Sequence, residues 1–182
     1  MAVTVPPREF VPLPNGATLR ALEMKSRHEG SGLQRTSLIG EWRVENVWGK
    51  QNTQPSAATS AALRAVGASL RIQADEDQQL LLCTSIQLGF VHLSFIGPGR
   101  LEHRRPLLLF HFSRLTLSIA GKTLATVSLP VPAPKREPFF APIAIGSLES
   151  GRRWLAARGR GGGMALWVEQ ADSLPQGTQP LE

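Results

Sequence analysis

Short alternating segments separated by turn residues restrict this chain to an all-β architecture. The first begins at Gly40-Glu41-Trp42, where apolar and polar residues alternate as in a strand with one buried face. Its predicted inward positions are Leu38, Gly40, Trp42, Val44 and Trp48. No helical pattern long enough to connect parallel strands follows, so we exclude a parallel α/β fold.

Further alternating or continuously apolar segments extend this pattern to about seven to nine short strands. The clearest segments are Ser69–Gln73, Gln79–Gln87, Phe90–Ile96, Leu107–Phe112, Arg114–Ile119, Thr123–Leu129, Arg153–Arg158 and Met164–Val168. Gly97-Pro98-Gly99 is predicted as a turn, and Pro130–Pro142 as an irregular crossover. Because neighbouring segments are joined as hairpins, we predict a lipocalin-like, mostly antiparallel, up-and-down β-barrel, with a sandwich as the alternative.

The chain divides into a lead-in, one barrel domain and a tail. Residues 1–36 are rich in Pro, Gly, Arg and Ser, with a short helical pattern at Thr18–Arg27, whereas residues 37–171 hold the strands and 172–182 are polar. With 182 residues, 42% of them hydrophobic, the chain suits one folded domain. We therefore predict a single β-barrel with short helical segments near the N-terminus.

Composition also bears on location and partners. The single cysteine, Cys83, suits a reducing compartment, and we expect neither a cleaved signal peptide nor a transmembrane helix. The net charge of +6 calls for an acidic partner, such as an anionic membrane surface. The basic residues are spread along the chain without a nucleic-acid-binding module, so we expect no nucleic-acid partner. Because the single cysteine indicates a reducing compartment and no signal peptide or transmembrane helix is expected, we predict a cytoplasmic location.

No residue pattern predicts a reaction centre, a cofactor or a metal site. The glycine run 159–163 precedes a strand, whereas a phosphate-binding loop precedes a helix. His92, His103 and His111 lie on neighbouring segments, but no carboxylate or cysteine completes a ligand set. Cys83 lies in an apolar strand, where a thiol is usually inert. We therefore expect a protein that is not an enzyme.

Both ends of the barrel region resemble the plastid lipid-associated proteins, or fibrillins, of plastids and cyanobacteria. Their barrel opens with a Gly-x-Trp strand, as at Gly40-Glu41-Trp42, and closes with a strand, an Arg-Gly turn and a hydrophobic strand, as at 154–168. The pair Phe139-Phe140 before the closing hairpin is similar too. The likeness spans roughly residues 36–170 and matches a short, cyanobacterial-type member of this lipocalin-like family.

The resemblance implies a barrel that binds a carotenoid, quinone or lipid and associates peripherally with photosynthetic membranes at the thylakoid. Arg158 is the predicted polar anchor or turn stabiliser. The other predicted ligand-binding residues are Trp42, Val44, Leu82, Leu117, Phe140, Trp154 and Trp167. Two alternatives stay open: a lipocalin-like bilin lyase, and a structural barrel that acts through its basic surface. The ligand and the oligomeric state are not predicted.

Overall fold

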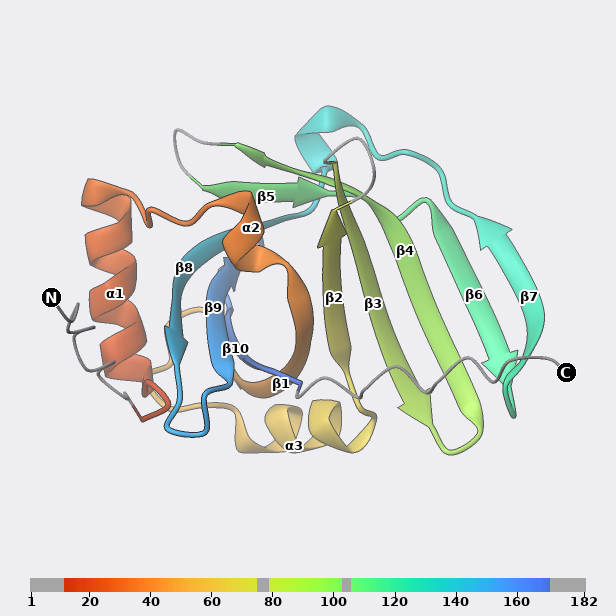
Figure 1. Ribbon diagram of the computed structural model, residues 1–182, viewed down its shortest axis with the longest axis horizontal. Coiled ribbons are helices and arrows are strands. Elements are labelled where there is room, and N and C mark those ends of the chain that lie inside the picture. Colours follow the sequence, from red (N-terminus) through yellow and green to blue (C-terminus); the bar gives the residue numbers. More distant parts are fainter. Residues whose placement is uncertain (1–11, 75–78, 103–105, 171–182) are drawn as a thin grey trace, which may run out of the picture.

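An antiparallel sheet of ten strands dominates the protein, and the computed structural model shows it curling into a barrel (Figure 1). The structure describes residues 12–74, 79–102 and 106–170. In chain order the strands are β1 (Gly40–Trp48), β2 (Ser69–Ala74), β3 (Leu80–Leu88), β4 (Val91–Glu102), β5 (Leu107–Phe110), β6 (Arg114–Ile119), β7 (Lys122–Ser128), β8 (Phe139–Ser147), β9 (Arg153–Gly159) and β10 (Met164–Glu169). Across the sheet their order is β3-β2-β1-β10-β9-β8-β5-β4-β6-β7.

A second pairing of β3 closes the ring. Besides β2, strand β3 pairs with β4 along its whole length, from Leu80 opposite Gly99 to Leu88 opposite Val91. This contact joins eight strands into a closed barrel and leaves β6 and β7 outside it. Side chains can fill the interior of a barrel of this size. The predicted antiparallel barrel is confirmed, and the sandwich alternative falls away.

A bulge in β1 reverses the face on which its last residues point. The register of β1 against β10 shifts between Val44 and Asn46. An extra residue moves every later side chain to the other face of the strand. Trp48 therefore packs in an apolar cluster on the outer side of the barrel, whereas Trp42 faces the interior. The prediction that both lie on one face is wrong.

Gly97-Pro98-Gly99, predicted as a turn, lies within strand β4. Strand β4 pairs with β6 through Val91–Ile96 and with β5 through Gly99–Glu102, so the segment marks a change of partner. At Gly97, a Cβ would lie 1.9 Å from the carbonyl oxygen of His111, which means that only glycine fits there. Close approach of two backbones explains Gly97, and the Leu82 side chain, whose Cδ1 would lie 2.3 Å from a Cβ at the other glycine of the segment, explains Gly99.

The helices lie against the outside and the ends of the barrel. They are α1 (Gly16–Glu29), α2 (Arg35–Leu38), α3 (Ala57–Ala65) and the 3₁₀ turn η1 (Pro134–Arg136). The Asn15 side chain accepts a hydrogen bond of 2.9 Å from the Thr18 amide and so caps the first turn of α1. Helix α1 confirms the helical pattern in the predicted lead-in, and it packs along β8 (Figure 1).

Strand β8 overlaps the end of the predicted irregular crossover, Pro130–Pro142. A proline in a strand removes one backbone donor and normally weakens the strand assignment. Here the register against β9 shifts between Pro142 and Ala144, and β5 pairs with β8 only at Phe139 and Phe140. No described strand pairs with Pro142 on the β5 side. The missing amide therefore breaks no ladder there.

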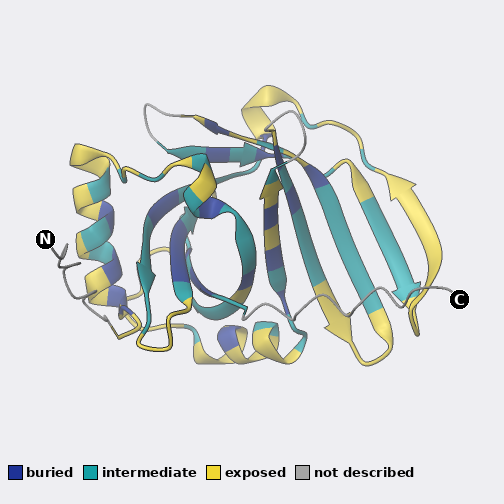
Figure 2. Ribbon diagram, in the orientation of Figure 1, coloured by how far each residue is buried: buried dark blue, intermediate teal, exposed yellow. Residues whose placement is uncertain are grey.

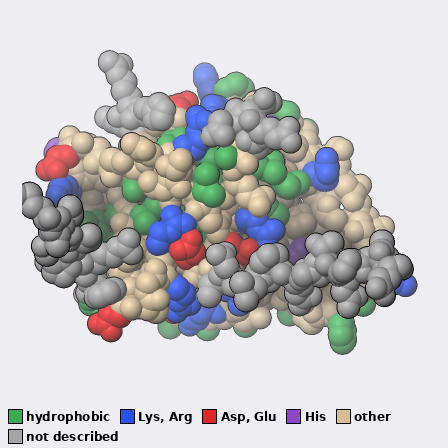
Figure 3. Space-filling model, in the orientation of Figure 1, with side chains coloured by type: hydrophobic (Ala, Val, Ile, Leu, Met, Phe, Trp, Pro, Cys, Tyr) green, Lys and Arg blue, Asp and Glu red, His purple; other side chains and the backbone are tan. Residues whose placement is uncertain are grey.

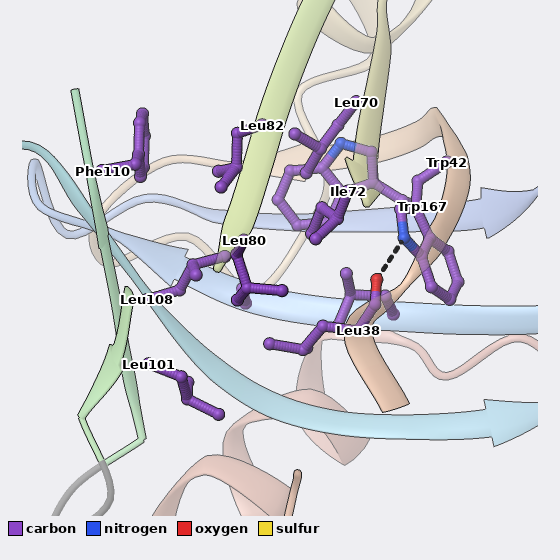
Figure 4. Packing of buried hydrophobic residues seen from close by; sticks show 12 residues of the cluster. Leu38, Trp42, Leu70, Ile72, Leu80, Leu82, Leu101, Leu108, Phe110 and Trp167 are labelled. Carbon is purple, nitrogen blue, oxygen red and sulfur yellow. Dashed lines mark hydrogen bonds between the residues drawn. The ribbon is translucent and has the colours of Figure 1, made fainter. Parts of the chain in front are cut away.

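Two apolar clusters lie on opposite faces of the same strands. The interior cluster fills the barrel around Trp42, Leu82 and Trp167, none of which is more than 6% exposed (Figure 4). The outer cluster joins Leu19 of α1 to Trp48 and other residues of the sheet. Burial of a large apolar side chain stabilises a fold by about 1.5–3 kcal/mol. Helix α1 is thus an integral part of the barrel's packing.

Beyond the ring, the sheet continues as an open wing. We define the wing as β6, β7 and the parts of β3 and β4 that continue this sheet, residues 84–88 and 91–96. Strand β7 pairs with β6 alone, and all 7 of its residues are exposed (Figure 2). The Ala120-Gly121-Lys122 hairpin between β6 and β7 was predicted, but its position outside the ring was not.

Replacing Gly97 should destabilise the fold. We expect Gly97→Ala to cost about 2–3 kcal/mol, because the added Cβ would overlap backbone atoms that cannot shift independently of the sheet. Equilibrium urea unfolding followed by Trp fluorescence measures the loss. Gly161→Ala is the matched control, because no atom lies within 4 Å of a Cβ there, and its unfolding free energy should change by no more than about 1 kcal/mol. Equal losses would contradict the prediction.

Candidate ligand-binding site

One end of the barrel interior, beside α2, is occupied by the chain's own side chains. Leu38 of α2 and Trp42 of β1 are fully buried, and the Trp42 indole Nε1 donates a hydrogen bond of 3.0 Å to the Leu38 carbonyl (Figure 4). The guanidinium carbon of Arg153 lies 5.0 Å from the centroid of the Trp42 ring. Because this end is closed, the surfaces that a ligand could reach are the opposite end of the barrel and the wing.

A continuous row of aromatic rings runs from the wing into the barrel. Phe95 of β4 lies 5.5 Å from Phe112, which lies 5.4 Å from Phe110 of β5, between ring centroids. Phe110 stacks on Phe140 of β8 at 5.0 Å, and Phe140 meets the edge of Trp167 of β10 at 5.6 Å. Phe95, Phe112 and Phe140 keep part of their surface exposed. We call this set the aromatic row.

The aromatic row ends at a groove in the open mouth of the barrel. This groove holds about 440 Å³, and its apolar lining includes Val47, Leu63 of α3, Phe140, Ala165 and Trp167. A volume in this range is typical of pockets that take small molecules. The mouth is therefore the part of the barrel interior that is open to a ligand.

The inner face of the wing is predominantly apolar and partly exposed. Its side chains lie on the same face of the sheet as inward-facing Leu82 of β3. Those on β3 follow Leu82 at steps of two residues, and those on β4, β6 and β7 are their partners across the strands. We call this surface the apolar wing face, and it consists of Ile86, Leu88, Val91, Leu93, Phe95, Leu115, Leu117, Ile119, Ala125 and Val127. None of these residues is buried (Figure 2). A contiguous exposed apolar face of this kind is a candidate binding surface.

The other face of the wing is polar, and the wing carries no carboxylate. Serine and threonine dominate the outer face, where Ser69 and Ser85 share a hydrogen bond of 2.8 Å. Glu102 is the one acidic residue between Gln79 and Arg136 in the sequence, and it lies outside the wing. In the right-hand part of Figure 3, over β4, β6 and β7, basic and apolar side chains are visible without an acidic one. The described residues of the wing thus place no negative charge on either of its faces.

Five predicted ligand-binding residues belong to the barrel interior. Trp42, Leu82 and Trp167 are members of the interior cluster, and Val44 and Phe140 pack against it. Of these, Phe140 and Trp167 also line the mouth groove, whereas Trp42 and Leu82 are fully buried. The structure therefore brings only part of the predicted set to a surface that a ligand can reach.

Leu117 lies on the apolar wing face, away from the barrel interior, where it pairs with Leu93 of β4. Trp154 points to the outer side of β9 and belongs to the cluster beneath α1, so its expected place in the cavity is wrong. Its ring covers Gly146, where a Cβ would come within 2.4 Å of it. The physical reason is parity, because Trp154 is adjacent to inward-facing Leu155 in the strand.

Arg158 stabilises the turn that follows β9, as predicted, and also holds α1. Its Nη1 donates to the Gly162 carbonyl, while Nε and Nη2 donate to the two carboxylate oxygens of Glu23. Arg27 adds a hydrogen bond of 2.8 Å to the same carboxylate. Burial raises the pKa of Glu23, but hydrogen bonding and charge from Arg158, together with Arg27, outweigh it and hold that pKa below its usual value.

Residues considered for chemistry lie apart from one another. His92 is on the outer face of β4, His111 follows β5 with Nδ1 3.8 Å from Glu137, and His103 falls outside the described residues. Burial raises the pKa of the Cys83 thiol, which favours its unreactive form. Within the described ranges, no group of three or more potential metal ligands occurs.

Sequence reasoning missed the aromatic row as a unit. Phe95, Phe110 and Phe112 are separated in the sequence from Phe140 and Trp167, so no spacing rule predicts their contact. The available signal was that Phe95 and the apolar residues near it alternate with polar residues, which predicts a strand with one apolar face.

Comparisons of this chain with protein-family models, with curated proteins and with solved structures gave no significant match. None of the helices in the described part of the chain is long and apolar enough to cross a lipid bilayer.

Removing Arg158 should weaken the fold in a pH-dependent way. Because the Glu23 pKa is lowered on folding, the pair contributes stability above the ordinary Glu pKa and loses it as pH falls through the folded-state pKa. We expect Arg158→Gln to cost about 2–3 kcal/mol at pH 7, and less at about pH 3.5. Urea unfolding at both pH values measures this.

Arg152→Gln is the control for this pair, because Arg152 lies exposed in the β8–β9 turn. It should change the unfolding free energy by less than about 0.5 kcal/mol at either pH. Part of the Arg158→Gln loss, from the Gly162 contact, will not depend on pH. A loss of equal size at both pH values would show that the Glu23 pair contributes nothing.

Proposed function

We propose that this protein binds an elongated hydrophobic molecule, a carotenoid, quinone or lipid, in its barrel mouth and along its wing. The observation that carries this proposal is the aromatic row, which joins the mouth groove to the apolar wing face without a break. Aromatic rings and aliphatic side chains on both surfaces offer apolar contact over a path longer than the groove alone.

The shape of the site favours a long ligand over a compact one. A compact molecule would be held by the groove of about 440 Å³ and would leave the apolar wing face in water. A polyene or isoprenoid chain would cover both, and each apolar square ångström removed from water contributes about 25 cal/mol. The polar outer face of the wing would stay solvated. The ligand class is the one that the fibrillin resemblance implies.

We further propose that the protein associates peripherally with photosynthetic membranes. A wing without carboxylates and a net charge of +6 support contact with anionic lipid, at about 1 kcal/mol per well-placed Lys or Arg. The protein would act by binding alone. Transfer of a bilin to an apo-phycobiliprotein in a coupled assay would instead identify it as a bilin lyase.

A structural barrel that acts through its basic surface is the second candidate function. It is favoured by one observation: side chains of the chain itself occupy much of the barrel interior, including Trp42 and Leu82 at 0% exposure. Ligand titration separates the two candidates, because a structural barrel would show no saturable binding.

Ligand binding should change the fluorescence of Trp167. Titration with β-carotene, decylplastoquinone or oleate is expected to give a saturable change with at least one of them, because Trp167 lines the mouth groove. Leu117→Gln should weaken that binding about tenfold, since it removes apolar contact on the wing. Met24→Gln is the control, because Met24 is exposed on α1. Absence of saturable change with all three compounds would overturn the proposal.

A further inference from the structure

A second groove lies on the outer side of the barrel, between α1 and the turn that joins β9 to β10. It holds about 420 Å³, and its charged lining residues are Arg20, Glu23, Arg27, Lys50 and Arg158. Four cations therefore face one carboxylate. Strands β9 and β10 separate this groove from the apolar interior, so it is independent of the proposed ligand site.

The single carboxylate is already fully engaged. Arg158 binds both oxygens of Glu23, and Arg27 binds one of them at 2.8 Å. The Glu23 side chain is 11% exposed, so little of it remains to attract another cation. Arg158 also donates to the Gly162 carbonyl, so all three of its nitrogens are engaged within the protein. Glu23 and Arg158 thus form the fixed floor of the groove.

The remaining cations are only partly compensated, because the one carboxylate of the groove binds Arg158 and Arg27. Among the described residues, neither Arg20 nor Lys50 makes a hydrogen bond or an ion pair, and Arg27, whose side chain is 69% exposed, uses one nitrogen only. Arg20 and Arg27 are seven residues apart on α1, so they lie on one helix face about 10 Å apart. Lys50 approaches from the loop after β1, and its Cγ would be 2.9 Å from a Cβ at Gly162.

We propose that this groove binds a phosphate ester through Arg20, Arg27 and Lys50. Guanidinium groups bind phosphate oxygens through paired, charge-assisted hydrogen bonds, and a Lys ammonium adds a point charge. A dianionic phosphate matches the uncompensated charge better than a neutral ligand, and Met24 at the same groove allows for an apolar part of the ester. The phosphate would also bridge α1 to the loop after β1.

Inorganic phosphate is the probe for this site. In low-salt buffer, phosphate should raise the melting temperature of the full chain more than sodium chloride of equal ionic strength, because it binds the folded state. Isothermal titration calorimetry gives the dissociation constant directly. For the double variant Arg20→Gln/Lys50→Gln, we expect affinity to fall about tenfold, which corresponds to about 1.4 kcal/mol.

Two controls separate site binding from general charge. Arg114→Gln/Lys122→Gln removes two cations from the wing and should leave the phosphate affinity within about twofold of the parent. Arg20→Lys/Lys50→Arg keeps the charge at the groove and should retain most of the affinity. Circular dichroism confirms that each variant folds. An equal loss in the wing variant, or no effect of phosphate beyond that of chloride, would overturn the proposal.

The source of the phosphate, a lipid headgroup or a free ester, is resolved by a second pair of measurements. Sedimentation with phosphatidylglycerol vesicles, against phosphatidylcholine vesicles, tests the headgroup, and calorimetry with glycerol 3-phosphate tests the free ester. Dependence of either on Arg20 and Lys50 supports the site. Binding that is the same in the Arg20→Gln/Lys50→Gln variant counts against it in both measurements. Glycerol 3-phosphate carries no hydrophobic cargo, and the vesicle result is judged by its dependence on Arg20 and Lys50, which lie outside the mouth groove and the wing. Failure of this proposal is therefore distinguishable from failure of the proposed carotenoid, quinone or lipid binding.

Discussion

One guanidinium group, that of Arg153, holds the closed end of the barrel together. It pairs with Glu169 at the end of β10, donates to the carbonyls of Ser37 and Ile39 around α2, and lies over the Trp42 ring. The hydrogen bond and charge of Arg153 outweigh the effect of burial and keep the pKa of Glu169 below its usual value. The start of β9, the end of β10 and the helix that covers the interior are thereby joined at one point.

This closure makes the barrel asymmetric, and the proposed ligand site depends on that asymmetry. Side chains occupy the end beside α2, whereas the opposite end opens into a groove and continues as a wing whose inner face is apolar. The apolar surface of the barrel interior thus continues through the open end onto the inner face of the wing. A ligand bound there would be held along its length, with one side covered by the sheet.

The fold class followed from the alternation of residues, because a period of two is a local property of the chain. The face on which Trp48 lies did not, since a single bulge after Val44 reverses it. Gly97-Pro98-Gly99 has the composition of a turn, yet Gly97 is required by the nearby backbone of His111 and Gly99 by the side chain of Leu82. Trp154 was assigned to the wrong face because adjacent residues of a strand point to opposite faces, so an error of one position exchanges inside and outside. The aromatic row needed contacts between distant strands, which no spacing in the sequence contains.

The joint between β5 and β8 differs from every other joint of the ring. It has two residue pairs, whereas β3 and β4 share nine. At this joint the circumference is set mainly by rings in contact, Phe110 against Phe140, and not by a ladder of backbone hydrogen bonds. Rings slide past each other at lower cost than ladders break. The β5–β8 joint is therefore the seam of the barrel wall that the fewest residue pairs hold, and the place where the wall would separate at the lowest cost.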